Sequence, residues 1–317
     1  MFLNETKGQM MNILMAEPRG FCAGVDRAIQ IVEKALEKFG APIYVRHEIV
    51  HNKAVVDALK EQGAIFVKEI TEVPHGAAVV FSAHGVAEVV YEEAAKKELK
   101  IIDAACPLVK KVHKSAKRHD SKGRTIVLIG HDGHPEVEGT KGQIDGDMIL
   151  VSSPEEVASV EIDDSHALAY ITQTTLSTDE TKDIIAALKL KFPRIEGPEM
   201  GDMCYATTNR QMAVRELAEK VDLLLVVGSS NSSNSKRLSE LGSQLGVESH
   251  LIDSKDHIDP SWLVGKKQVG ISSGASAPEH LVQGVVAWLK ENTDIESVES
   301  SVTMEENVKF NLPEILR

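Results

Sequence analysis

Short apolar runs alternate with amphipathic segments along most of the chain. Continuous apolar runs such as 126–129 and 223–227 are typical of strands that are covered on both faces of a parallel sheet. Between these runs, apolar residues recur at the spacing of a helix. Strands that alternate with helices in this way indicate an α/β protein. We predict helices over residues 26–39, 52–62, 86–97, 109–119, 178–191, 210–221, 235–245 and 278–292.

The strand–helix pattern occurs three times, and each repeat opens near a cysteine. The three cysteines are Cys22, Cys106 and Cys204. A polar loop follows each cysteine 28 or 29 positions later, and these loops contain His51, His134 and Ser232. A second polar loop follows in each repeat, and these loops contain His84, Thr174 and Ser276. A repeat of this length indicates three similar structural units.

We therefore predict three small α/β units with mainly parallel sheets, in a pseudo-threefold, three-lobed arrangement around a central cavity. The units cover residues 12–105, 106–200 and 201–290, after a leader over 1–11 and before a C-terminal tail over 291–317. Within the tail, the acidic stretch 291–306 is expected to be solvated, and 308–312 is a candidate strand. Ligands of parallel sheets bind beyond the carboxyl ends of the strands, which is where the cysteines and the polar loops fall.

Charge and hydropathy narrow the class of protein. The net charge of −13, from 35 basic and 48 acidic residues, argues against nucleic acid or an anionic membrane as the main partner. No apolar run approaches the ~20 residues of a transmembrane helix, and the first residues lack the pattern of a signal peptide. We expect a cytoplasmic protein with reduced thiols, and the odd number of cysteines argues against a disulfide framework.

The three cysteines are candidate metal ligands. A single free cysteine is most often a small buried apolar residue, but three at equivalent points of a repeat indicate one thiolate each for a shared metal centre. Their spacing is too wide for a local metal knuckle. Three thiolates with an open position would also suit a catalytic zinc site in a hydrolase of a phosphorylated metabolite. A non-catalytic cluster-based sensor that binds an anion is a further alternative.

The polar loops are candidates for an anion pocket. Loops 232–234 and 274–278 combine hydroxyl groups with the free amides of helix starts, which bind phosphate. Taken singly, such residues are ordinary helix caps. Together with His51, His84 and His134 at matching positions, they favour an anion pocket. These loops contain no Lys or Arg, so the positive charge would come from imidazolium groups and backbone dipoles.

The remaining histidines match the repeat less well or lie outside it. His47 and His131 lie near the polar loops but fit the repeat poorly. The others are interpreted as surface residues or local structure: His75, His113, His119, His166, His250, His257 and His280.

Glu136 is a carboxylate inside these loops. Pro135 fits the first position of a helix, so His134 would cap that helix and Glu136 would lie in its first turn. A Glu there is commonly a partner of the helix dipole. Facing a bound anion, the pKa of Glu136 would rise, which suits a proton donor.

The motifs around these residues closely resemble those of the 4-hydroxy-3-methylbut-2-enyl diphosphate reductases, which act last in the non-mevalonate isoprenoid pathway. The resemblance covers about residues 12–292, in order and with no motif missing. The motifs that carry it are 18–25, 46–52, 81–86, 105–109, 133–140, 172–177, 204–211, 228–235 and 274–278.

The resemblance implies one 4Fe–4S cluster bound through Cys22, Cys106 and Cys204, with a fourth iron open to the substrate hydroxyl. The implied reaction is the reductive dehydroxylation of (E)-4-hydroxy-3-methylbut-2-enyl diphosphate to isopentenyl and dimethylallyl diphosphate. Glu136 and Thr174 match the pair that delivers the proton. The positions that match the diphosphate site are His51, His84, His134, Thr174, Ser232, Ser233, Asn234 and Ser276, and Thr207 is also expected to face the cavity.

The electrons would come from another protein. The sequence contains no G-x-G-x-x-G dinucleotide fingerprint and no Walker-type loop. The resemblance implies flavodoxin or ferredoxin, with its reductase, as the donor.

Overall fold

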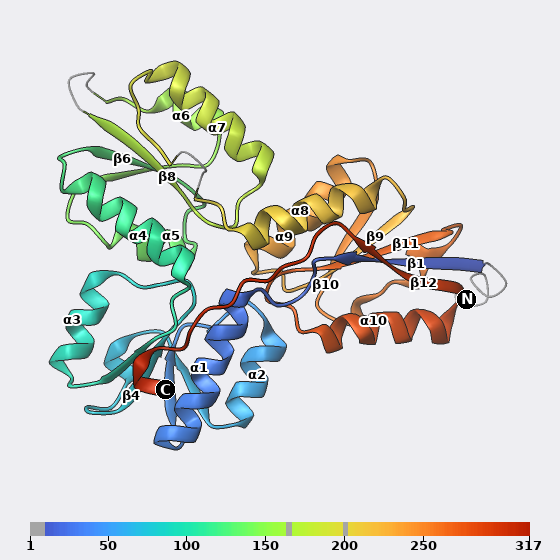
Figure 1. Cartoon of the computed structure of the whole chain (residues 1–317), viewed down its shortest axis with the longest axis horizontal. Helices are drawn as coiled ribbons and strands as arrows, with labels where there is room; N and C mark the ends of the chain where they lie inside the picture. Colours follow the sequence, from blue (N-terminus) through green and yellow to red (C-terminus); the bar gives the residue numbers. More distant parts are fainter. Residues whose placement is uncertain (1–9, 163–166, 199–201) are drawn as a thin grey trace. The chain divides into compact units, whose positions relative to one another are not determined.

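The computed structural model describes residues 10–162, 167–198 and 202–317, and the proposed leader lies outside them except for Met10 and Met11, which begin the first strand. In these residues the strands form three sheets of five, four and three strands, and every strand pair is parallel. The prediction of an α/β protein with parallel sheets is confirmed (Figure 1). No helix in this part of the chain is both long and apolar enough to cross a membrane.

The three sheets are consistent with the three predicted units, and by their contacts they fall into two compact units. The terminal unit contains residues 10–23, 51–53 and 205–309, and the central unit contains 24–50, 54–204 and 310–317. The predicted unit 12–105 is therefore divided, because its first strand pairs with strands from the end of the chain. An apolar run indicates a strand, but it does not indicate the partner strand.

The terminal unit contains the five-stranded sheet, with the order β10-β9-β11-β1-β12. Its strands are β1 (Met10–Glu17), β9 (Leu223–Val227), β10 (Glu248–Ile252), β11 (Gln268–Ser273) and β12 (Asp294–Val302). Its helices are α8 (Tyr205–Ala218), α9 (Ser233–Gln244) and α10 (Glu279–Asn292), with 3-10 turns at Lys255–His257 and Pro260–Leu263.

Helices cover both faces of this sheet, with α8 and α9 on one face and α10 on the other (Figure 1). Alternate side chains of β9 lie on opposite faces of the sheet. Leu223 and Leu225 belong to a buried cluster with Val282 of α10, and Leu224 packs in a second cluster with Val214 of α8. Burial on both faces explains why β9 is a continuous apolar run.

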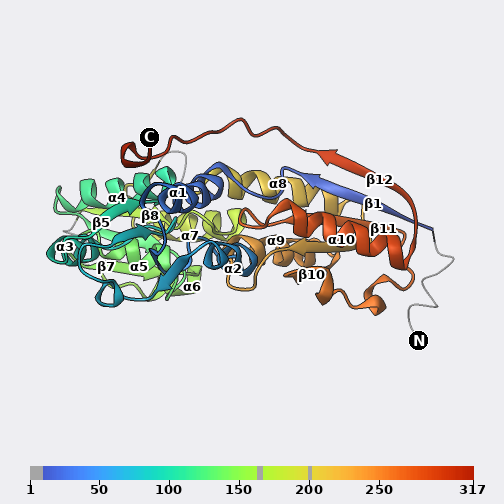
Figure 2. The same ribbon diagram turned by 90° about the horizontal axis from the view of Figure 1, so that it is seen from below.

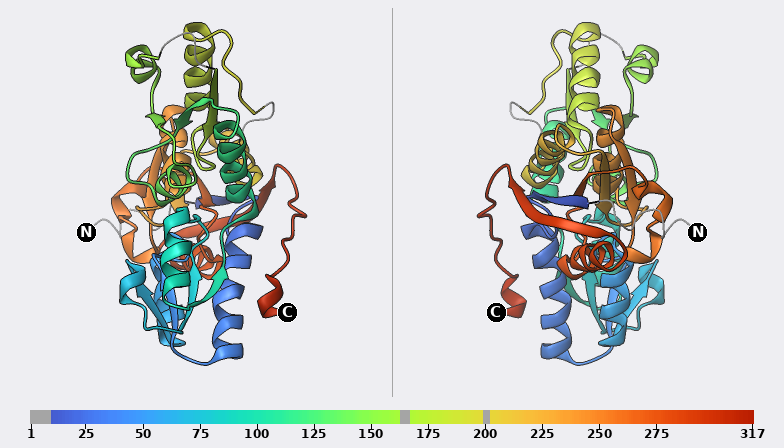
Figure 3. Two further views of the ribbon diagram at one scale, coloured as in Figure 1. Left: turned by 90° about the vertical axis from the view of Figure 1, so that its left-hand side faces the viewer. Right: turned by 90° about the vertical axis from the view of Figure 1, so that its right-hand side faces the viewer.

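The edge strand β12 was not expected. Residues 291–306 were predicted to be solvated because they are acidic, but Asp294–Val302 pairs with β1 along its whole length (Figures 2 and 3). An edge strand needs only its backbone and a few inward side chains, and Ile295 packs against the core here. The candidate strand 308–312 is not a strand in the structure.

The central unit contains the other two sheets, with the orders β3-β2-β4-β5 and β7-β6-β8. Their strands are β2 (Ile43–Arg46), β3 (Ala64–Val67), β4 (Ala78–Phe81), β5 (Lys100–Asp103), β6 (Thr125–Ile129), β7 (Met148–Val151) and β8 (Leu168–Thr172). The helices are α1 (Ala23–Phe39), α2 (Lys53–Glu61), α3 (Glu88–Lys96), α4 (Pro107–Asp120), α5 (Pro135–Lys141), α6 (Pro154–Ser159) and α7 (Thr178–Lys191), with 3-10 turns at Ile70–Glu72 and Glu314–Leu316.

The eight predicted helices are all present, with ends shifted by a few residues. The short helix α6 was not predicted. Its first turn has an unmistakable start in Ser153, which caps the amide of Glu156, followed by Pro154 at the first position. It is too short to show a helical repeat of apolar residues.

Candidate active site

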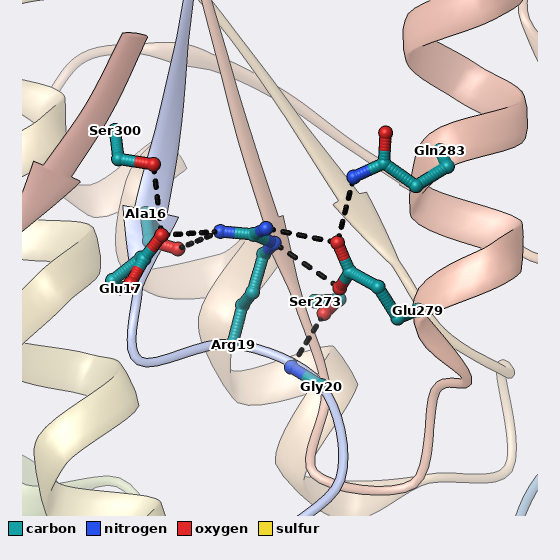
Figure 4. Close-up of polar contacts among 8 residues, drawn as sticks. All are labelled: Ala16, Glu17, Arg19, Gly20, Ser273, Glu279, Gln283 and Ser300. Carbon is teal, nitrogen blue, oxygen red and sulfur yellow. Dashed lines mark hydrogen bonds and ion pairs between the residues drawn. The ribbon is translucent and has the colours of Figure 1, made fainter. Parts of the chain in front are cut away.

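Cys22 lies in the loop that follows β1, the strand between β11 and β12. The backbone amide of Cys22 donates a hydrogen bond to the carbonyl of Ala275 (3.2 Å). Two residues earlier, the Gly20 amide donates to Ser273 Oγ (2.8 Å) (Figure 4). Gly20 has φ = +67°, a left-handed conformation that a residue with a side chain rarely adopts. The loop is therefore attached to the end of the neighbouring strand β11.

Arg19 lies in the same loop and is held by two carboxylates. Its guanidinium donates to both oxygens of Glu279, at 2.8 and 3.2 Å, and contacts Glu17 Oε1 at 3.2 Å (Figure 4). A two-pronged Arg–carboxylate contact fixes direction as well as distance. Arg19 thus links the end of β1 to the first turn of α10.

The start of α9 forms a tight polar cradle. Ser232 is the N-cap, and its Oγ accepts hydrogen bonds from the Ser235 amide (3.3 Å) and hydroxyl (3.0 Å). A Cβ on Gly228 or Gly274 would lie 2.2 or 2.0 Å from Ser235 Oγ, so only glycine fits at these two positions. Gly228 and Gly274, which follow β9 and β11, therefore pack directly against the first turn of α9. The free amides of such a helix start suit the binding of an anion.

Asn234 is a buried polar side chain that lacks a partner. It is 4% exposed, and within residues 10–162, 167–198 and 202–317 neither its Oδ1 nor its Nδ2 has a hydrogen-bond partner. An unsatisfied buried amide costs about 1–3 kcal/mol. A group that is costly in the free protein indicates a ligand at this point.

Ser276 and His51 are in contact in the terminal unit. Ser276 is 6% exposed, and its Oγ donates to the main-chain carbonyl of His51 (3.0 Å). The loops after β11 and before α2 are thereby joined. Of the residues predicted for the diphosphate site, His51, Ser232, Ser233, Asn234 and Ser276 belong to this unit.

Glu136 and Thr174 form a buried pair in the central unit. Glu136 is 2% exposed, its Oε1 accepts the Thr174 amide (2.7 Å), and its Oε2 accepts the Thr174 hydroxyl (2.9 Å). Burial raises the pKa of Glu136 to about 7, with a smaller contribution from the negative charge of Asp202, although the two hydrogen bonds from Thr174 oppose the rise. Near neutral pH the protonated and the ionised forms of this carboxyl group are therefore both populated.

The position of Glu136 follows from the start of α5, as predicted. His134 is the N-cap residue, and its Nδ1 accepts the amide of Glu136 (3.1 Å). Pro135 occupies the first helical position. An imidazole nitrogen that accepts a hydrogen bond carries no proton, so the donor nitrogen of the His134 ring is Nε2.

Thr174 also contacts the cysteine of the third repeat. The amide of Cys204 donates to the carbonyl of Thr174 (3.1 Å). Asp202 lies two residues earlier, accepts the Thr172 amide (3.4 Å), and has a raised pKa because it is buried. The carboxyl group of Glu136 is therefore one residue, Thr174, away from the backbone of a candidate metal ligand.

His84 and His134 lie against each other, with ring centroids 5.9 Å apart and perpendicular planes. Small residues permit this approach. A Cβ on Gly139 would lie 3.1 Å from the Gly85 carbonyl, and one on Gly142 would lie 2.2 Å from Ala87 Cβ. The turn after β4 can therefore rest directly on α5.

His113, interpreted from the sequence as a surface residue or local structure, is buried and packs against this turn. It is 8% exposed, and a Cβ on Gly85 would lie 2.6 Å from its Cε1. Burial lowers the pKa of His113 to about 4, so its ring is neutral at pH 7. Its place on the inner face of α4, between the buried residues Val112 and Ala116, was the signal available in the sequence.

Cys106 is the N-cap residue of α4, and its thiol makes no capping hydrogen bond. Its amide donates to the carbonyl of Ala83 (3.0 Å). The helix N-terminus attracts negative charge, which suits a thiolate ligand. Thr207, expected to face a cavity, is 1% exposed in the first turns of α8.

The three cysteines form no disulfide bond and are half-buried, Cys22 in the terminal unit and Cys106 and Cys204 in the central unit. Within either unit, the described part of the chain contains no group of three His, Cys, Asp or Glu side chains that could hold a metal ion. The set of three cysteines therefore stays a prediction. The chemistry of the set fits an iron–sulfur cluster, because cysteine thiolates are the ligands that hold such clusters.

Comparison with known proteins places these features in a family. The model of the family described as "LytB protein" matches residues 13–290. The chain is 57% identical to a 4-hydroxy-3-methylbut-2-enyl diphosphate reductase of Mannheimia succiniciproducens, over 97% of this chain and 98% of that protein. It is 58% identical to 4-hydroxy-3-methylbut-2-enyl diphosphate reductase 1 of Rhodopseudomonas palustris, over 95% and 98%.

Solved structures are similar as well. The E-1-hydroxy-2-methyl-but-2-enyl-4-diphosphate reductase from Plasmodium falciparum superposes with a TM-score of 0.92 at 38% identity, over 97% of each chain. A second structure, described as (E)-4-hydroxy-3-methyl-but-2-enyl diphosphate reductase, the terminal enzyme of the non-mevalonate pathway, gives a TM-score of 0.64 at 33% identity. That match covers 89% of this chain and 100% of the other.

Proposed function

The chain belongs to the LytB protein family, and we propose that it is the reductase of 4-hydroxy-3-methylbut-2-enyl diphosphate that ends the non-mevalonate pathway. The observation in the structure that supports this chemistry most directly is the buried pair of Glu136 and Thr174. The zinc hydrolase and the anion sensor receive no support, because each relative reported above is named as a reductase.

The protein is an iron–sulfur enzyme by family, and we propose that Cys22, Cys106 and Cys204 hold one 4Fe–4S cluster. Such a cluster supplies electrons one at a time and a Lewis acid for the leaving oxygen. The remaining residues bind the substrate and move the proton. Replacing any one of the three cysteines by Ser should remove or degrade the cluster, because a protonated hydroxyl is a poor ligand for a soft metal centre.

The diphosphate site is assigned to the polar loops. Their residues offer helix-start amides, hydroxyls, imidazoles and the unpartnered amide of Asn234, all of which suit phosphate oxygens. A bound diphosphate would satisfy Asn234 at the point where the free protein leaves it unpaired. The proposed contacts are His51, His84, His134, Thr174, Ser232, Ser233, Asn234 and Ser276.

Glu136 is the proposed proton donor. The reaction takes up two electrons and two protons, breaks the carbon–oxygen bond and releases water, so the hydroxyl must gain a proton as it leaves. With a pKa of about 7, Glu136 carries a proton in about half of the molecules at neutral pH. Its Oε2 is 2.9 Å from Thr174 Oγ1, so this hydroxyl is placed to relay the proton.

The decisive experiment is turnover by Glu136→Gln in cluster-loaded protein under anaerobic conditions. Gln keeps the size and can still accept the Thr174 amide while its NH₂ donates to the Thr174 hydroxyl. We expect unchanged iron content and substrate binding, with turnover at least ~10²-fold slower, the lower end for a lost general acid. Glu138→Gln, an exposed carboxylate on the same helix, is the matched control and should be fully active. Near-normal turnover by Glu136→Gln would contradict the assignment.

A further inference from the structure

We propose that the segment after β12, residues 303–312 and hereafter the C-terminal strap, holds two of the three cysteine loops in place through two buried arginines, Arg210 and Arg27. The strap lies beyond residues 13–290, the part that the family model matches. The significance of the cysteines rests on the proposed function. The contacts of the strap are properties of the ligand-free chain.

Arg210 connects the strap to the loop of Cys22. Its side chain is 1% exposed, and Nη2 donates to the carbonyl of Gly20 (2.8 Å), two residues before Cys22. Nη1 donates to both oxygens of Glu306 in the strap, at 3.0 and 3.2 Å. A buried guanidinium is costly without a counter-charge, so Glu306 determines whether Arg210 can stay at the Gly20 carbonyl.

The strap is itself fixed where it passes this loop. The Thr303 amide donates to the carbonyl of Glu17 (2.9 Å), which extends the pairing of β12 with β1 by one step. Asn209 Nδ2 donates to Glu306 Oε1 (3.0 Å). The loop of Cys22 is therefore held on both sides, by Ser273 and Ala275 at the end of β11 and by the strap through Arg210.

Arg27 repeats this arrangement in the central unit. It is 7% exposed, and its Nη1 donates to the carbonyls of Ala104 and Ala105 (both 3.3 Å), the two residues before Cys106. Its Nε donates to the main-chain carbonyl of Asn311 in the strap (2.8 Å). In both units, then, an arginine joins the strap to a carbonyl that precedes a cysteine.

Cys204 provides an internal reference. Its amide is bonded to Thr174 rather than to a residue positioned by the strap. Weakening the strap should therefore loosen Cys22 or Cys106 and leave Cys204 unaffected. Arg210, Arg27 and Glu306 act as positioning residues, because they are assigned to the backbone of the ligand loops and not to the substrate.

The test is the rate at which iodoacetamide alkylates each cysteine in full-length, cluster-free protein, followed by mass spectrometry. Glu306→Gln should raise the rate at Cys22 about tenfold, the effect of one lost charge-assisted hydrogen bond, with Cys106 and Cys204 unchanged. Glu305→Gln, the exposed neighbour, is the control and should leave all three rates unchanged. After reconstitution, Glu306→Gln should also lose iron to a chelator faster than Glu305→Gln.

Arg27→Lys tests the other half of the strap in the same assay. A lysine keeps the charge but lacks the fork that reaches Asn311 and two carbonyls together. The rate at Cys106 should rise while Cys22 stays unchanged, and Arg118→Lys, an exposed arginine on α4, should have no effect. The two variants should therefore have opposite selectivity.

Two results would overturn the proposal: no change at Cys22 in Glu306→Gln, or an equal rise at all three cysteines. Should Glu306→Gln fail to fold, Asn209→Ala removes only one contact of Glu306 and should give a smaller rise confined to Cys22. Failure of the proposed function is distinct, because wild-type protein would then take up no cluster while the selective alkylation persisted.

Discussion

At the scale of the residue, Glu136 links catalysis to stability. Burial raises its pKa from 4.5 to about 7, so between these values the folded protein keeps a proton that the unfolded chain releases. Stability must therefore fall as the pH rises through this window, and the fall is complete above pH 7. The shift corresponds to about 3 kcal/mol.

Cluster-free Glu136→Gln should lack this loss of stability. Urea unfolding at pH 4.5 and pH 8 should show wild-type protein losing about 3 kcal/mol more than the variant between the two values. Glu138→Gln should follow the wild type, because Glu138 is exposed. Parallel pH profiles for Glu136→Gln and wild type would mean that the carboxyl group is not buried as described.

Replacing Asn234 should change stability and ligand binding in opposite directions. Leu has a similar size and leaves no polar atom unpaired, so Asn234→Leu should raise the stability of the substrate-free protein by about 1–3 kcal/mol. It should also weaken inhibition by inorganic diphosphate at least ~10-fold, because a donor to phosphate is lost. A thermal melt without ligand and an inhibition constant check the two halves. A melt that shifts downward would show that the amide has a partner in the free protein.

At the scale of the element, the contact of α5 with the turn after β4 brings His84 and His134 together. In Gly142→Ala, a new Cβ would lie 2.2 Å from Ala87 Cβ and 3.0 Å from its Cα. The elements must move apart, which should cost about 1–3 kcal/mol of stability and raise KM more than it lowers kcat. Gly284→Ala is the control, because a Cβ there would meet nothing within 4 Å, and it should leave KM unchanged. An unchanged KM in Gly142→Ala would separate this contact from substrate binding.

Elements were predicted more reliably than their partners. The cap signals of His134 and Pro135 indicated the start of α5 and the place of Glu136, because these signals depend on neighbours in the sequence. The pairing of β1 with β11 and β12 depends on residues at the far end of the chain, and no local pattern encodes it. The strand β12 was not predicted because its residues are acidic, whereas its pairing with β1 uses the backbone and not the side chains.

The same limit applies to the site. The polar residues were proposed because they stand in repeated loops, but the missing partners of Asn234 and the burial of His113 required the packed structure. The contacts of Arg27 and Arg210 were missed for the same reason. Both arginines lie in helices, where a basic residue normally indicates a solvated face.

At the scale of the whole molecule, the source of electrons should be another protein. The sequence contains no dinucleotide fingerprint, so cluster-loaded protein should be inactive with NADPH alone. Activity should appear when flavodoxin or ferredoxin and its reductase are added, or when a strong chemical reductant replaces them. Sustained turnover on NADPH alone would contradict this, and a no-protein control with the chemical reductant excludes background reduction.

The place of β1 between β11 and β12 also affects how the protein is made. Met10–Glu17 leaves the ribosome long before its neighbours Gln268–Ser273 and Asp294–Val302. At about 5–20 residues per second, translation keeps the first strand waiting for roughly 12–50 seconds. Both edges of an apolar strand are open during that time, so the nascent chain is an expected client of ribosome-associated chaperones until Asp294–Val302 emerges.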